Sequence, residues 1–293
     1  MSTFVLLTIT GLGLGAMYFL IASGLSLIYG LMGVLNFAHG AFLTIGAYAF
    51  WFTETKLDDF SIWPRFLLAA VVAILVTTVF SALVELVLIR PLYGRHIDQV
   101  LVTVGLALAI TALVTAIWGN DARVIAAPKW LGETTTVLGA HIPNDRWTEI
   151  GTAVLVLFGL EAFLKRTRYG LIIRAGVENR AMVTALGIDV RKAFTLVFAI
   201  GGLAVGIAAV LSSVYFSTVD PQHGTALVIF AFIVVVIGGL GSLRGTALAA
   251  IVVGLVQQYA NYYASSGLGD LSVVLLLGLV LLVRPRGLSG SFA

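Results

Sequence analysis

The apolar positions of this chain form long uninterrupted runs, and the first acidic or basic side chain is Glu54. A charge near the centre of a bilayer costs several kcal/mol, and a membrane-spanning helix needs about 20 apolar residues. The residues before Glu54 therefore predict two spans. Between them lies the more polar stretch LNFAHGAF, Leu35 to Phe42, which predicts that the second helix is interrupted at its start.

Hydropathy divides the whole chain into nine apolar stretches, so nine crossings is the central prediction, with eight or ten left open. The stretches lie near 4–30, 37–53, 66–89, 99–119, 148–164, 193–217, 225–240, 246–263 and 271–283. The chain is 60% hydrophobic and 11% charged, with a mean hydropathy of +1.06, far above a soluble domain. We expect an all-α polytopic membrane protein with a single transmembrane domain over residues 1–293.

Lys and Arg are distributed unevenly between the loops. The segments 90–98, 165–192, 241–245 and 284–293 carry 12 of the 17 basic residues. Because cytoplasmic loops are enriched in Lys and Arg, these segments are predicted to be cytoplasmic. An odd number of spans then places the N-terminus outside and the C-terminus inside. The net charge of +3 is therefore a topology signal and does not indicate nucleic-acid binding.

Two connections are long enough to carry function. The outer one, roughly Asn120 to Trp147, predicts a loop that lies along the membrane surface or meets an external partner. The inner one, Lys165 to Lys192, has basic residues at both ends. Within it Ala175 to Leu186 predicts a short helix, closed by Gly187 where a left-handed cap is favoured. That helix is either a docking element or a passive surface helix.

Asn36 and His39 are the polar residues of the first interruption. An unpaired amide or imidazole in hydrocarbon costs several kcal/mol, so both must face protein or a water-filled path. Gly33 and Gly40 bracket them, and glycine permits a helix break or a close helix contact. The pattern indicates either a discontinuous helix that lines a solute route or a polar interhelical bond that only locks the packing.

A second glycine-rich interruption, VIGGLGSLRG, runs from Val236 to Gly245. Aligning Arg244 with His39 also matches Gly238 with Gly33. Paired broken helices surround the central site of many transporters, but so short a match is weak evidence for a repeat. Both breaks fall on the predicted cytoplasmic side, which argues against an inverted repeat, so their relationship stays open.

Enzymatic interpretations find little support in the residues. GLSG at Gly287 to Gly290 matches the GxSG of rhomboid-type proteases, but Ser289 lies in the predicted cytoplasmic tail. The chain has no cysteine and four scattered histidines, with no H-E-x-x-H and no P-loop. If the chain moves solute with ATP, another chain must supply the ATPase.

A self-sufficient channel or secondary transporter is the competing class. It would need an ion-coupling carboxylate deep in the membrane or a ring of like charges. Glu85 and Glu161 lie near the predicted inner ends of their helices, within reach of Arg90 or of the basic cluster at 165–168. They therefore predict structural ion pairs rather than proton carriers.

Five segments carry a resemblance that covers nearly the whole chain, and NFAHG in a broken helix is its most specific part. GLSLIYGLMGVLNFAHGAFLTIGAYAF (Gly24 to Phe50) resembles the signature of the permease subunits of branched-chain amino acid ABC importers. Further matches are VELVLIRPLYGR (Val84 to Arg95), RYGLIIRAGVENRAMVTALGIDVRKAF (Arg168 to Phe194), VIGGLGSLRGTALAAIVVGL (Val236 to Leu255) and LLVRPRGLSG (Leu281 to Gly290).

The resemblance implies a subunit of the bacterial inner membrane that works with two ATPase subunits and a periplasmic substrate-binding protein. It also implies a homologous second permease in a heterodimer, or a second copy of the same chain. ATP would bind to the partner subunits, so we expect no catalytic site, metal or cofactor in this chain.

The resemblance also assigns roles to residues. It places Asn36, Phe37, His39 and Gly40 in the translocation region, to which we add the glycines of the two breaks, Gly33, Gly238 and Gly239. It places the helix Ala175 to Gly187 against the ATPase as a coupling helix, with Ala175, Glu178, Arg180, Ala185, Leu186 and Gly187 as candidate coupling residues.

Two departures from the family pattern stand out. Ala41 stands where many relatives have glutamate, and Tyr93 stands where an arginine often follows the Arg-Pro-Leu run. The first leaves the substrate open, because related permeases serve urea, short amides and aromatic acids. An apolar path with few charges suits neutral or zwitterionic solutes, so we favour branched-chain or other hydrophobic amino acids. The expected mechanism is alternating access around the break at residues 33–40, driven through the coupling helix.

Overall fold

Nine apolar helices form the body of the protein in the ranges that the computed structural model describes, residues 2–33, 36–187, 189–265 and 267–289. They coincide with the nine predicted apolar stretches, which confirms the all-α polytopic class. They are α1 (Ser2–Met32), α2 (His39–Lys56), α3 (Ile62–Val84), α4 (His96–Trp118), α6 (Asn144–Arg166), α8 (Val190–Phe216), α9 (His223–Gly238), α10 (Leu243–Tyr263) and α11 (Leu268–Val283).

Further elements lie in the connections between these helices. A π-helical turn, η1 (Glu85–Ile89), and a 3-10 turn, η2 (Arg90–Leu92), extend α3, while α5 (Lys129–Gly132) and α7 (Arg168–Ala185) lie in the two long connections. Strand β2 (Thr134–Val137) pairs with β3 (Ala140–Pro143) in a hairpin, and β1 (Arg123–Val124) pairs with β4 (Thr218–Val219).

The helices differ in whether they can cross a membrane alone. By length and composition, α1, α3 with its two short turns, α4, α6 and α8 each qualify. Helices α9 and α10 qualify only as a pair, bent by 119° at the break between them, and α11 is a shorter apolar helix. The outward faces of α3, α4 and α11 carry exposed Leu, Ile and Val side chains, which hydrocarbon accepts and water would not.

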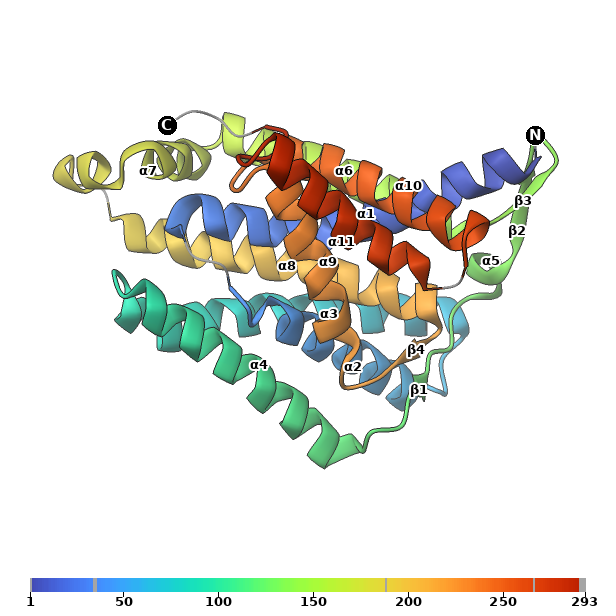
Figure 1. Cartoon of the computed structure of the whole chain (residues 1–293). Coiled ribbons are helices and arrows are strands. Elements are labelled where there is room, and N and C mark those ends of the chain that lie inside the picture. The colour runs from blue at the N-terminus through green and yellow to red at the C-terminus, as the bar shows by residue number, and fades with distance from the viewer. Residues whose placement is uncertain (1, 34–35, 188, 266, 290–293) are drawn as a thin grey trace.

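The two ends of the molecule are distinct. The N-terminus and the β2–β3 hairpin lie at one end, and α7 and the C-terminus lie at the other (Figure 1). We call these the hairpin end and the α7 end. The segments that carry most of the basic residues are the connection after α3, helix α7 with its flanks, the α9–α10 connection and the C-terminal segment. The chain therefore has an apolar body with a basic α7 end.

Helix α1 is the centre of the bundle and packs against α6, α8, α9 and α10. Lipid tails are as apolar as leucine, so helices in a membrane associate through close van der Waals packing, which glycine makes possible. A Cβ on Gly15 would lie 2.5 Å from the Ala250 carbonyl oxygen, and a Cβ on Gly24 would lie 2.9 Å from the backbone of Gly201. Glycines thus set how closely α1 approaches α10 and α8.

The contact between α2 and α9 gives the first prediction. A Cβ on Gly224 would fall inside the van der Waals shell of the Gly40 carbonyl oxygen, whereas a Cβ on Gly278 of α11 would meet nothing within 4 Å. We expect Gly224→Ala to destabilise the fold by about 1–3 kcal/mol through overpacking. The matched change Gly278→Ala should be neutral or slightly stabilising. Thermal unfolding of the purified protein in detergent measures the effect of both substitutions. Equal unfolding midpoints for the two variants would contradict the close contact between Gly224 and Gly40.

Candidate functional site

The first break lies between the end of α1 and the start of α2. Gly33 follows the last residue of α1 with a φ of +68°, and its N–H donates to the Tyr29 carbonyl over 2.7 Å. Asn36 is buried, and its Oδ1 accepts a 3.1 Å hydrogen bond from the Ala38 N–H. The His39 N–H donates to the Asn36 carbonyl over 3.2 Å. Asn36 thus organises the turn that starts α2.

His39 shows how deep this turn lies. Its imidazole is fully buried, and Nε2 lies 2.9 Å from the Ile21 carbonyl oxygen in the middle of α1. Met32 ends α1 at the α7 end, 11 residues beyond Ile21, which is about 16 Å along a helix. The chain therefore turns back into the molecule before α2 begins, as the predicted interruption of the second helix requires.

Two buried polar atoms at the break have no hydrogen-bond partner among the residues that the structure describes. They are Asn36 Nδ2 and His39 Nδ1. A cavity of about 10 Å³ adjoins Asn36, lined also by Met32, Ile89 and Phe198, and such a volume is near the minimum for one water. An unsatisfied buried polar atom costs about 1–3 kcal/mol, so these two atoms are available to a water or to a solute.

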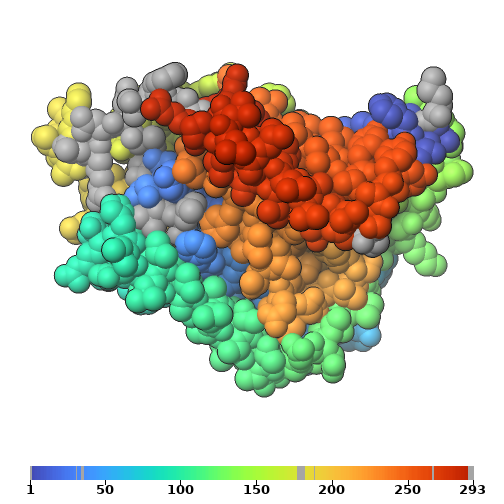
Figure 2. Space-filling model, in the orientation of Figure 1, coloured from blue at the N-terminus to red at the C-terminus, as the bar shows by residue number. Residues whose placement is uncertain are grey.

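Helix α9 covers the start of α2. The Gly224 N–H donates to Thr44 Oγ1 over 3.1 Å, and the rings of Phe37 and Phe232 lie 4.9 Å apart. Figure 2 shows blue atoms of the α1–α2 region at the surface between α4 and α9. The start of α2 is therefore buried against α9.

The second break joins α9 to α10. Gly239 and Gly241 have φ values of +99° and +82°, which only glycine adopts readily. A Cβ on Gly238 would lie 2.5 Å from the Gly245 backbone, so the two helix ends are in close contact. Ser242 begins α10, and its hydroxyl accepts from the Gly245 N–H over 3.1 Å. Both glycines predicted here, Gly238 and Gly239, thus shape the bend.

The second break contacts the last turn of α1 at the α7 end. A Cβ on Gly30, near the end of α1, would lie 3.1 Å from the Cα of Gly241. The two breaks therefore follow helix ends on the same side of the molecule, as the sequence indicates. Their aligned residues differ, however, because His39 is fully buried whereas Arg244 is exposed and its Nε lies 2.5 Å from Glu161 Oε1.

The C-terminal segment is hydrogen-bonded to the second break. The N–H groups of Leu288 and Ser289 donate to the carbonyls of Ile237 and Gly238 over 2.8 and 3.1 Å. These carbonyls belong to the last turn of α9, which has no further helical partner. Two of the motifs that carry the family resemblance are therefore in direct contact.

Helix α7 is longer than predicted. It begins at Arg168 rather than near Ala175, because the Thr167 hydroxyl caps it by accepting from the Gly170 N–H over 2.9 Å. The predicted left-handed residue at its other end is confirmed, with a φ of +78° at Gly187. Ala175 is half-buried against the core, whereas Ala185 and Leu186 are exposed. The side chains of Glu178 and Arg180 lie outside the described residues.

The predicted ion pairs are confirmed. Glu161 pairs with Lys165 over 2.8 Å and with Arg244, which joins α6 to α10. Glu85 pairs with Arg90 over 3.2 Å at the end of α3. Glu161 and Glu85 therefore have structural partners, as their positions near basic residues indicate.

Sequence reasoning missed two features at the hairpin end. The first is a pocket of about 230 Å³ at the α8–α9 junction, lined by Phe216, Thr218, Asp220, Gln222, His223, Ala226 and Leu227. In it His223 is buried, with Nε2 2.9 Å from Ser212 Oγ. The second is Arg146, which lies 3.4 Å from Asp145, 3.3 Å from Glu149 and 3.5 Å over the Tyr215 ring. Asp145 and Glu149, at the edge of the predicted span, are the sequence features that could have indicated the Arg146 cluster.

Comparison with known proteins identifies the family. The model described as "Branched-chain amino acid transport system / permease component" matches residues 7–284. The chain belongs to this family. The permease protein BraD of the high-affinity branched-chain amino acid transport system of Pseudomonas aeruginosa is 32% identical, covering 96% of this chain and 94% of BraD. LivH of Escherichia coli K12, with the same description, is 29% identical over 96% of this chain and 93% of LivH.

A more distant relative has a different name. The fructose import permease protein FruF of Bifidobacterium longum is 28% identical over 85% of this chain and 69% of its own length. No solved structure matches the chain. The family resemblance of the sequence motifs is thus confirmed. The chain is a multi-pass membrane permease component of a transport system, which implies partner subunits.

The second prediction concerns the contact between the C-terminal segment and the second break. Gly287 has a φ of +78°, and its Cβ would lie 2.7 Å from Gly239; Gly94 has a φ of +87° with nothing within 4 Å. Alanine at either position costs about 1–2 kcal/mol of backbone strain. Only Gly287→Ala adds a steric clash, so its unfolding midpoint should fall below that of Gly94→Ala. Indistinguishable midpoints would show that the segment is not fixed at the break.

Proposed function

We propose that the chain is the transmembrane permease subunit of an ATP-binding-cassette importer for branched-chain or other hydrophobic amino acids. The observation that carries this proposal is the family match over residues 7–284, which includes the NFAHG break. The relatives BraD and LivH, both named for branched-chain amino acid transport, cover nearly the whole chain. Separate ATPase subunits supply the energy.

The proposed solute route follows the first break. Asn36, Phe37, His39 and Gly40 lie where α2 starts inside the molecule, and the second break with Gly238 and Gly239 meets the end of α1 next to Gly33. The unsatisfied atoms Asn36 Nδ2 and His39 Nδ1 offer hydrogen bonds to a neutral or zwitterionic solute in an open state. Alternating access then opens this region to each side of the membrane in turn.

The α7 end is proposed to face the cytoplasm and the ATPases. It carries most of the Lys and Arg residues, as cytoplasmic loops do. Helix α7 is the longest element in these loops, and Ala185, Leu186 and Gly187 at its end are exposed. The hairpin end then faces the periplasmic binding protein of an inner-membrane complex. The transporter is completed by a homologous permease or by a second copy of this chain.

Reconstitution tests the function directly. Proteoliposomes that hold the chain, the candidate ATPase and the binding protein should accumulate labelled leucine only with ATP and with every partner present. Unlabelled leucine, isoleucine and valine should compete, whereas urea, an aromatic acid and fructose should not. Fructose is included because FruF is related. Downhill uptake by the chain alone would instead identify a channel or carrier.

A paired substitution tests the role of α7. We expect Glu178→Ala with Arg180→Ala to weaken co-purification of the ATPase and to lower leucine uptake several-fold, with an unchanged unfolding midpoint. The control, Lys129→Ala with Glu133→Ala, removes the same two charge types from exposed positions at the hairpin end, away from the proposed ATPase face, and should leave co-purification of the ATPase unchanged. Full, ATP-coupled uptake by the α7 variant would contradict the assignment of α7 as the helix that contacts the ATPase.

A further inference from the structure

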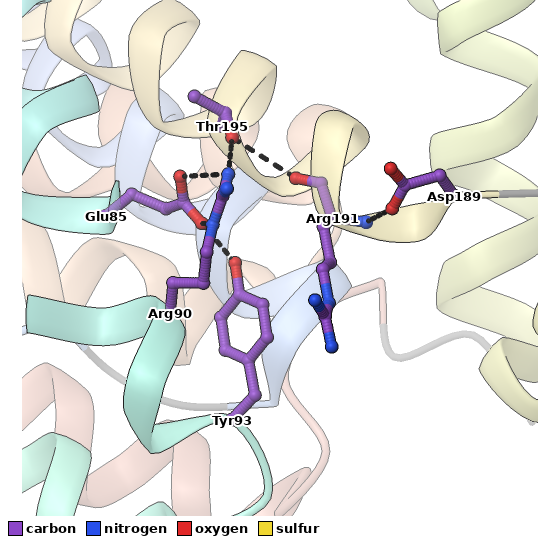
Figure 3. Close-up of polar contacts among 6 residues, drawn as sticks. All are labelled: Glu85, Arg90, Tyr93, Asp189, Arg191 and Thr195. Atoms are coloured by element: carbon purple, nitrogen blue, oxygen red, sulfur yellow. Dashed lines mark hydrogen bonds and ion pairs between the residues drawn. The ribbon is translucent and has the colours of Figure 1, made fainter. Parts of the chain in front are cut away.

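Glu85 is the centre of a polar network at the α7 end. It lies in η1 and is fully buried. Its carboxylate accepts hydrogen bonds from Arg90 Nε over 3.2 Å, from Arg90 Nη2 over 3.3 Å and from the Tyr93 hydroxyl (Figure 3). Burial, and next the bond to Glu85, raise the pKa of Tyr93, so its hydroxyl keeps the proton that it donates. The buried charge is therefore compensated on both oxygens.

The same network reaches the start of α8. Arg90 Nη2 donates to Thr195 Oγ1 over 2.6 Å, and Thr195 Oγ1 donates to the Arg191 carbonyl over 3.2 Å. Asp189 Oδ1 accepts from the Arg191 N–H over 3.1 Å and so caps α8 (Figure 3). Only residues 186–189 separate α7 from α8. A continuous series of bonds thus runs from the α7–α8 junction to the end of α3.

The backbone of α3 is irregular where the network attaches. Residues 85–89 form a π-helical turn, and such turns often occur at functional sites. One turn earlier, the Ser81 hydroxyl donates to the Phe198 carbonyl of α8 over 2.7 Å. The end of α3 and the first turns of α8 are therefore joined by polar bonds at two levels.

The network adjoins the first break. Ile89 of η1 and Phe198, which lies one turn after Thr195, both line the cavity beside Asn36. A displacement of α3 relative to α8 would change the shape of this cavity. The network consequently lies between the helix proposed to contact the ATPase and the break proposed to line the solute route.

We propose that Glu85, Arg90, Tyr93 and Thr195 form a coupling joint that makes the end of α3 move together with the α7–α8 junction. This inference rests on the proposed function of α7 as the element that contacts the ATPase. The bonds involve an ionised pair and are stronger than neutral ones, so the joint transmits displacement where apolar helix faces would slide. The four side chains are positioning residues and need not touch the solute.

Single hydroxyl deletions test the joint without changing charge. Tyr93→Phe and Thr195→Val each remove one bond to the charged pair, and Thr195→Ser keeps the hydroxyl. In the reconstituted complete transporter we expect leucine transported per ATP hydrolysed to fall about threefold or more for the two deletions. ATPase co-purification should be unchanged, and Thr195→Ser should restore the ratio.

Two matched controls remove hydroxyl groups outside the network. Among the described residues Thr78 Oγ1 bonds only its own helix, to the Ile74 carbonyl over 2.7 Å, so Thr78→Val is the control for Thr195→Val. Tyr48 Oη has no hydrogen-bond partner among the described residues, so Tyr48→Phe is the control for Tyr93→Phe. Both controls should leave the transport-to-ATP ratio unchanged.

The outcomes separate the joint from the proposed function. Lack of ATP-dependent uptake by the unmodified complex would overturn the proposed importer function. If the unmodified complex couples transport to ATP hydrolysis, and the Tyr93→Phe and Thr195→Val variants have the same transport-to-ATP ratio, the joint alone is overturned. Transport and ATP hydrolysis that fall in parallel, or a lower unfolding midpoint at an unchanged ratio, would reduce the network to a structural role and would likewise overturn the joint.

Discussion

The interior of a bilayer offers a chain no hydrogen bonds, so every departure from a helix inside the membrane must be satisfied by the protein itself. This constraint shapes both breaks. At the first, the Asn36 side chain supplies the acceptor that the backbone of the turn needs. At the second, the N–H groups of Leu288 and Ser289 satisfy carbonyls that the end of α9 leaves open. In both cases another part of the chain supplies the hydrogen-bond partner.

Close packing follows from the same environment. With no hydrophobic drive between helices in lipid, α1 is held by contact at distances that only glycine permits, as at Gly15 against Ala250 and Gly24 against Gly201. The starts of α2 and α9 meet in the same way at Gly40 and Gly224. Because the break is enclosed by these contacts, the polar atoms of Asn36 and His39 face protein rather than lipid.

The sequence predicted the features that depend on composition and local chemistry. Long apolar runs define helices, and a carboxylate next to basic residues predicts an ion pair, so the helices, the pair of Glu85 with Arg90 and the pair of Glu161 with Lys165 could be found, whereas the pair of Glu161 with the distant Arg244 was missed. The start of α7 was missed because the Thr167 cap looks like any loop threonine. The depth of His39 and the bond between Arg90 and Thr195 depend on how distant helices pack, which hydropathy does not encode. The β2–β3 hairpin was missed because its Leu138–Gly139 turn gives only a weak signal.

The location of the charged groups separates the parts proposed to move from those proposed to bind solute. The route proposed at the first break carries an amide and an imidazole but no acidic or basic side chain, so a zwitterionic solute meets no fixed countercharge that would hold it too tightly to leave. Ionised pairs lie instead at the helix ends: Glu161 joins α6 to α10 through Arg244, and Glu85 holds Arg90, which bonds Thr195 of α8. Strong, directional bonds thus lie where elements are proposed to move as one unit, and weaker ones lie where solute is proposed to pass. Tyr93, one of the two departures from the family pattern, belongs to the first group, because its phenol hydroxyl donates a hydrogen bond to Glu85.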